Sequence, residues 1–194
     1  YSYDIYTQVG QILREPGEVD PLDGLEPALL LAVGESQSAG RMVTYADAVQ
    51  PLAGVYNGIL VHSRGGQGTA LSSDPASAVP SVARIRTDLD VPVLQLQMET
   101  DLIGLGSLNA RQDDTDMIRT WEVAGTAHAD QNTLDYGAAS GREWAPDASL
   151  DLSSLCPTIN EGPQRYLVRR AIDALVAGPT ALLIAKAHKI HDRL

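Results

Sequence analysis

The chain has 194 residues, of which 44% are hydrophobic and 20% charged, so it is long and apolar enough to form one domain with a sizeable core. Its 25 acidic residues outnumber its 14 lysines and arginines, which gives a formal net charge of -11. A surface of this sign repels phosphate backbones and anionic lipids, so we expect neither a nucleic acid nor a membrane as a partner.

The predicted elements alternate between helix and strand along the chain. In the first half they are a helix at 3–13, a strand at 28–33, a helix at about 39–49 closed by Pro51, and a strand at 55–62. In the second half they are a helix at 79–88, strands at 91–98 and 118–123, and a helix that begins at Pro163 and ends at Gly178. The long irregular segments are 63–76 and 131–162. This alternation predicts an α/β fold with a mostly parallel sheet flanked by helices.

The turn between the first predicted strand and the next helix reads G-E-S-Q-S at residues 34–38. A serine on a tight turn from strand to helix has its hydroxyl exposed at the carboxyl edge of the sheet. We therefore expect Ser36 to be a nucleophile. We expect the backbone N–H of Gln37, at the helix N-terminus, to stabilise an oxyanion. The alternative interpretation of Ser36 is a helix N-cap, a position that serine favours.

A nucleophilic serine needs a base, and the base needs an acid to orient it. His128 follows a predicted strand in A-G-T-A-H-A-D and is the expected base. Asp101 follows another strand in Q-M-E-T-D and is the expected acid, with Glu99 as its rival. The order serine, acid, histidine is that of one class of serine hydrolases. The alternative is that His128 is an ordinary loop histidine and Asp101 a turn residue.

Two residues at the end of the second predicted strand are candidates for the substrate pocket. His62 either lines that pocket or is a packed, hydrogen-bonded residue. Arg64 either binds a substrate carboxylate or lies at the surface.

We expect no metal and no cofactor. His188 and His191 have i, i+3 spacing in an ambiguous tail, and the cluster of Asp113, Asp114 and Asp116 lacks the glycine and glutamate of an EF-hand. The sequence contains no Walker loop and no G-x-G-x-x-G after a strand.

Three blocks of the chain resemble the α/β-hydrolase-domain proteins whose nucleophile turn reads G-x-S-Q-[ST]-G-R. The blocks are G-E-S-Q-S-A-G-R at 34–41, V-P-V-L at 91–94 with E-T-D at 99–101, and W-E-V-A-G-T-A-H-A-D at 121–130. The resemblance covers about residues 28–130. It implies a serine esterase-like fold in which Ser36 and His128 are catalytic and the acid is Asp101 or Glu99. It implies no particular substrate.

The chain departs from that pattern in two places. Ala39 is an extra small residue after the serine, which is expected to shift the helix start by one position. The fold normally has about four strands before the nucleophile strand, and here only residues 1–27 precede that strand. We therefore expect a single α/β-hydrolase domain over 1–194 that is incomplete at its N-terminus. Whether it is also incomplete at its C-terminus stays open. A second chain or segment would complete the fold and bring the second oxyanion donor.

The predicted function is that of a serine hydrolase that cleaves a small-molecule carboxylic ester through an acyl-enzyme. Amide or thioester cleavage needs the same groups. The alternative function is a non-catalytic α/β module for binding or assembly. The single cysteine, Cys156, excludes an internal disulfide and indicates no compartment.

Overall fold

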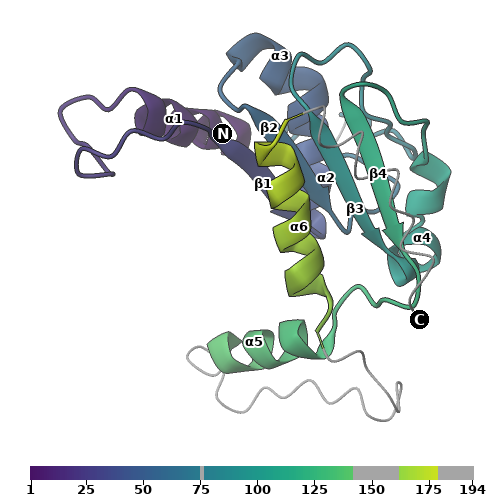
Figure 1. Ribbon diagram of the computed structural model, residues 1–194. Helices are drawn as coiled ribbons and strands as arrows, with labels where there is room; N and C mark the ends of the chain where they lie inside the picture. The colour runs from purple at the N-terminus through teal and green to yellow at the C-terminus, as the bar shows by residue number, and fades with distance from the viewer. Residues whose placement is uncertain (75–76, 142–161, 179–194) are drawn as a thin grey trace.

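The centre of the molecule is a four-stranded parallel sheet with the order β1-β2-β3-β4 (Figure 1). The computed structural model describes residues 1–74, 77–141 and 162–178. The strands are β1 (Leu31–Glu35), β2 (Gly58–His62), β3 (Val93–Met98) and β4 (Ile118–Val123). Each strand is parallel to its neighbour. All four carboxyl ends therefore lie at one edge of the sheet.

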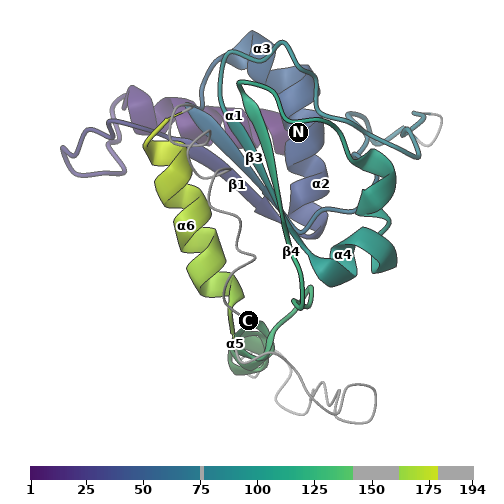
Figure 2. The same ribbon diagram turned by 45° about the vertical axis from the view of Figure 1, so that its right-hand side comes forward.

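Helices cover both faces of the sheet (Figure 2). On one face lies α6 (Gln164–Val176), which shares a core with the leucines of β2 and β3. On the other face lie α1 (Ser2–Arg14), α2 (Gln37–Thr44) and α3 (Gln50–Ala53), which enclose a larger core. Since both faces are covered, every residue of β2 and β3 is buried, as expected for inner strands of a parallel sheet.

The remaining helices lie at the carboxyl edge of the sheet or beyond it. They are α4 (Glu99–Gly104), the 3₁₀-helix η2 (Ser107–Ala110) and α5 (Gln131–Gly141). Figure 1 shows α4 directly after β3 and α5 set apart from the sheet. No residue of α5 is buried. No helix in the described part of the chain is both long and apolar enough to cross a membrane.

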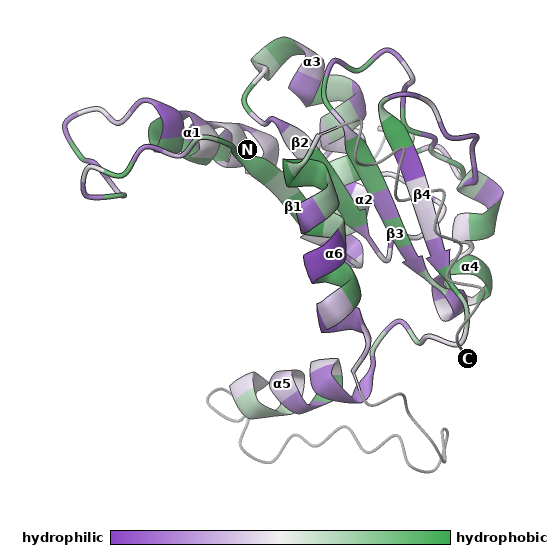
Figure 3. Cartoon of the chain, in the orientation of Figure 1, coloured by the Kyte–Doolittle hydropathy of each residue, from purple (hydrophilic) through white to green (hydrophobic). Residues whose placement is uncertain are grey.

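Polar positions interrupt the hydrophobic strands of the sheet (Figure 3). Gln95 and Gln97 of β3 are both 4% exposed. The amide of Gln95 is satisfied, because it accepts from Arg64 and donates to Thr120. At the outer edge, β1 pairs only with β2 among the described residues, and Val33 of β1 is exposed.

All four predicted strands and the helices at both ends of the described chain are confirmed. The predicted helix at 39–49 differs from the structure, because α2 begins at Gln37 and continues through a π-helical turn, η1 (Tyr45–Val49), into α3. Pro51 does not end this helix. It lies in the first turn of α3, where a missing N–H costs little, and Gly54 ends the helix in a left-handed conformation.

The predicted helix at 79–88 is wrong, because this segment has no regular structure. Its N–H groups bond to distant parts of the chain instead of to one another. Ala83 donates to the carbonyl of Gly66, Ile85 to the side chain of Gln112, and Arg86 to the carboxylate of Asp47. Tertiary hydrogen bonds thus outweigh the local helical pattern.

The predicted irregular stretch at 131–162 is partly wrong, because it begins with helix α5. Asp130 caps this helix by accepting from both the backbone N–H and the hydroxyl of Thr133. Residues 142–161 and 179–194, including His188 and His191, lie outside the described residues.

Candidate active site

Ser36 lies between β1 and α2 in a strained backbone conformation, with φ 55° and ψ -117°. A non-glycine residue rarely adopts this conformation, and such strain concentrates at functional turns. The turn is held by the Ser36 N–H, which donates to the carbonyl of His62 at 2.9 Å. It also depends on Gly34, where a Cβ would lie 2.5 Å from Met42 Cγ and 2.5 Å from the carbonyl oxygen of Ser38. Gly34 therefore lets the start of α2 approach β1.

The carboxyl edge of the sheet brings three of the predicted site residues into one hydrogen-bonded relay. The Oγ of Ser36 lies 2.9 Å from Nε2 of His128. The Nδ1 of His128 lies 2.6 Å from Oδ1 of Asp101. The three residues follow β1, β3 and β4, so they are far apart in sequence and meet because parallel strands end at one edge. In a neutral imidazole that donates from Nδ1 to Asp101, Nε2 is free to accept the proton of the serine.

The carboxylate of Asp101 is fully buried, and its second oxygen accepts the N–H of Met98 at 2.7 Å. The hydrogen bond to Asp101 raises the pKa of His128 above its ordinary value. The charges of Asp101 and Glu35 add to this effect, and burial opposes it. Glu99 lies on the same turn but points elsewhere, because its carboxylate accepts the N–H of Gly125.

The loop that carries His128 is fixed from two directions. From α4, the Thr100 hydroxyl accepts the N–H of His128 at 2.7 Å. From α6, the Gln164 side chain donates to the carbonyls of Ala127 and His128, both at 2.7 Å. Gln164 is 4% exposed, and its own N–H donates to Asp130 at 3.0 Å. Sequence reasoning missed both contacts: Thr100 lies inside the E-T-D block, and no pattern singles out Gln164.

His62 is a buried residue beside the relay, 4% exposed. Its Nδ1 lies 3.9 Å from a carboxylate oxygen of Glu35, and its Nε2 has no hydrogen-bond partner among the described residues. Burial lowers the pKa of His62, although the charges of Glu35 and Asp101 oppose the shift. Its role as a pocket residue stays a prediction.

Arg64 is 1% exposed and lies beneath the loop that follows β2. Its guanidinium donates to the carbonyls of Gly65, Gly66 and Ala83 and to the side chain of Gln95. Burial lowers the pKa of Arg64 to about 10. The alternative that Arg64 lies at the surface is therefore wrong, because the guanidinium is buried and holds the loop. Its predicted contact with a substrate carboxylate stays untested.

A recess of about 530 Å³ opens beside Ser36. Its wall is formed by the start of α2, the loop after β2, and the segment that joins α4 to η2. The lining residues are Ser36, Gln37, Gly40, Gly65, Gly66, Gln67, Gly68, Thr69, Ser81, Leu105, Gly106 and Asn109. The N–H of Gln37 at the start of α2 has no acceptor in the described part of the chain, so it is available to an oxyanion beside Ser36.

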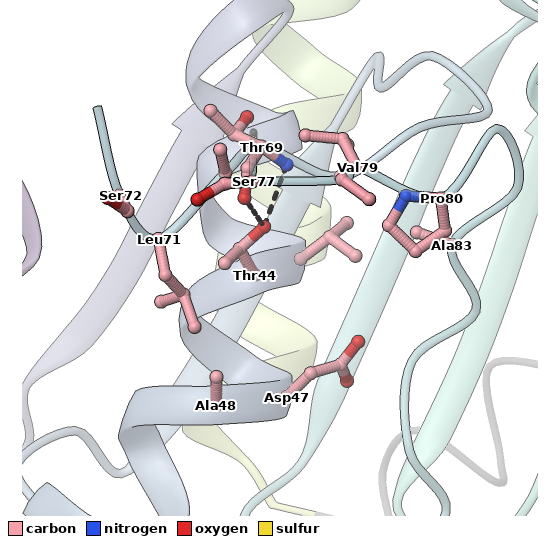
Figure 4. Close-up of a pocket in the computed structure, with 14 residues that line it drawn as sticks. Thr44, Asp47, Ala48, Thr69, Leu71, Ser72, Ser77, Val79, Pro80 and Ala83 are labelled. Carbon is pink, nitrogen blue, oxygen red and sulfur yellow. Dashed lines mark hydrogen bonds between the residues drawn. The ribbon is translucent and has the colours of Figure 1, made fainter. Parts of the chain in front are cut away.

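A second hollow of about 430 Å³ lies further along the same helix, beside Ala48 and Asp47 (Figure 4). Gly68 and Thr69 line both hollows. The Thr44 hydroxyl accepts the N–H of Thr69 at 2.8 Å and donates to its carbonyl at 2.6 Å, as the dashed lines in Figure 4 show. The segment between the hollows is therefore fixed to α2.

The parallel sheet, its covering helices and the strained serine turn are features of an α/β-hydrolase. The model of the alpha/beta hydrolase domain family matches residues 1–177. Because the match covers most of the chain, this chain belongs to the alpha/beta hydrolase domain family, which confirms the predicted resemblance and fold class. No curated protein and no solved structure matches the chain. Family membership is consistent with a hydrolase and names neither a reaction nor a substrate.

Proposed function

We propose that the protein is a serine hydrolase that cleaves carboxylic esters through an acyl-enzyme. The observation that carries this proposal is the unbroken relay from Ser36 Oγ through His128 to Asp101, with distances of 2.9 Å and 2.6 Å. These distances lie within the reach needed for proton transfer from a nucleophile to its base. Membership of a hydrolase family supports the same reaction class.

In the first half of the proposed reaction, Ser36 Oγ attacks the ester carbonyl carbon while His128 Nε2 takes the hydroxyl proton. The carbonyl oxygen becomes an oxyanion beside the free N–H of Gln37. Collapse of this intermediate breaks the bond to the alcohol oxygen, which leaves with the proton from His128. Ser36 then carries the acyl group as an ester.

In the second half, a water molecule attacks the acyl carbonyl while His128 takes one of its protons. Collapse releases the carboxylic acid and returns the proton to Ser36 Oγ. Asp101 stays ionised throughout, holds the tautomer of His128 and stabilises the imidazolium that forms twice in each turnover. Its direct hydrogen bond to Nδ1 favours Asp101 over Glu99 as the acid.

Hydrolysis of 4-nitrophenyl acetate by the wild type, Ser36→Ala and Ser38→Ala tests the proposal. Ser38 is an exposed serine two residues further along, so it is the matched control. We expect turnover by the wild type and by Ser38→Ala, and a loss of at least about 10³-fold in kcat for Ser36→Ala. No turnover by folded wild type, or equal turnover by Ser36→Ala, would leave the non-catalytic module as the better function.

A further inference from the structure

The recess beside Ser36 is lined by uncharged polar groups. Its side chains include the amides of Gln67 and Asn109 and the hydroxyls of Thr69 and Ser81, with Leu105 as its one large apolar residue. The side chains of Gln67 and Asn109 are exposed, and neither amide makes a hydrogen bond to another described residue. These groups are free to exchange water for a ligand at little cost.

The loop after β2 also contains a backbone N–H, that of Gln67, which points away from Arg64. The guanidinium draws the carbonyl of Gly66 towards itself, and the Ala83 N–H donates to the same oxygen. In a trans peptide the N–H points opposite to the carbonyl, so the N–H of Gln67 is directed away from Arg64. This N–H has no acceptor among the described residues, and Gln67 lines the recess.

Charge around the recess disfavours an anion. None of its lining residues is charged. Arg64, which lies behind it, directs its donors to three carbonyls and one amide oxygen. Glu35 lies next to Ser36 with its side chain 49% exposed and acts electrostatically on His128. The chain as a whole carries a net charge of -11. A carboxylate or phosphate here would meet repulsion from these charges and no cation among the lining residues.

We infer that the recess is a specificity subsite for an uncharged group that donates and accepts hydrogen bonds, such as a hydroxyl, on one side of the scissile ester. This inference rests on the proposed function. Gln67 and Asn109 are the side chains that recognise the group.

Two series of isosteric esters test the inference, one for each side of the ester bond. On the acyl side, the esters are ethyl glycolate, ethyl propionate and monoethyl malonate. On the alcohol side, they are 2-hydroxyethyl, propyl and carboxymethyl propionate. The hydroxyl also changes the intrinsic reactivity of an ester, so each kcat/KM is divided by the rate constant for hydroxide-catalysed hydrolysis of the same ester. Within a series, we then compare these normalised values for the hydroxyl ester, its methyl isostere and the anion. The ratio of kcat/KM values in one protein sample is independent of the fraction of folded enzyme.

In one of the two series, we expect the hydroxyl ester to exceed its methyl isostere by about tenfold in normalised kcat/KM, and the anionic ester to fall below both. In Gln67→Leu and Asn109→Leu the hydroxyl preference should fall towards one. It should stay unchanged in Gln8→Leu, which alters an exposed glutamine on α1.

The outcomes distinguish a failure of the proposed subsite from a failure of the proposed function. If wild type cleaves the methyl isosteres and Ser36→Ala does not, the proposed function stands. Equal normalised values for hydroxyl and methyl esters in both series would then overturn the subsite, as would a preference that survives in both leucine variants. If the wild type cleaves no ester of either series, the proposed function fails and the subsite fails with it.

Discussion

The side chain of Gln164 holds the backbone of His128 in place from the far side of the sheet. It donates to the His128 carbonyl at 2.7 Å and to the neighbouring carbonyl of Ala127 at the same distance. Gln164 is the first residue of α6, which packs on the face of the sheet opposite α2. The position of the imidazole relative to Ser36 thus depends on a residue that does not touch the serine.

Gln164→Ala should lower kcat more than it raises KM. The variant leaves two carbonyls without their donor and lets the His128 loop shift, and a small displacement of a base costs about tenfold or more in rate. It should also lower the free energy of unfolding by about 1–3 kcal/mol. Steady-state kinetics and urea unfolding measure the two effects, with Gln8→Ala as the control. A kcat equal to that of the wild type would show that Gln164 does not position the base.

Asp101→Asn should lower kcat by about 10⁴-fold, because an amide in place of the carboxylate favours the wrong tautomer of His128. Glu99→Gln should retain activity within a few-fold, since an amide oxygen can still accept the N–H of Gly125. The two variants are matched, because each exchanges one carboxylate for an amide on the same turn. A larger loss in Glu99→Gln than in Asp101→Asn would reverse the assignment of the acid.

Activity should fall at low pH as His128 becomes protonated, because only the neutral imidazole accepts the serine proton. The hydrogen bond to Asp101 raises the pKa of His128, so the acid limb of kcat/KM should lie above 6.5, the ordinary value for histidine. The charge of Glu35 adds to this shift. In Glu35→Gln the acid limb should therefore move to lower pH, and Glu18→Gln should leave it unchanged. A move to higher pH would contradict this assignment.

Gly34→Ala should destabilise the fold by about 1–3 kcal/mol, because the new methyl group would overlap the backbone of Ser38 and the side chain of Met42. Gly137→Ala is the matched control. Gly137 lies within α5 with no atom close to its Cβ position, so alanine there should stabilise by about 0.5–1 kcal/mol. Chemical denaturation measures both changes. Equal stability of Gly34→Ala and wild type would contradict the close packing of α2 on β1.

The sequence predicted the strands and the meeting of Ser36, Asp101 and His128, because each of these residues lies shortly after a predicted strand and parallel strands end at one edge of the sheet. It did not decide between Asp101 and Glu99 as the acid, since two residues on one helical turn differ only in the direction of their side chains. Helix 79–88 was wrong because its N–H groups found distant acceptors, such as the Asp47 carboxylate. The contact of Gln164 with the His128 loop depends on how α6 docks, which no local pattern encodes.

Labelling by a fluorophosphonate probe is the most direct test of the central claim that Ser36 is an activated nucleophile. The probe forms a covalent bond with a serine hydroxyl only where a base accepts the proton, so peptide mass mapping reports both the reaction and its site. We expect one adduct on Ser36 in the folded wild type and none in Ser36→Ala, with labelling much slower in Asp101→Asn. No adduct on the folded wild type, or equal labelling of Ser36→Ala, would contradict the claim.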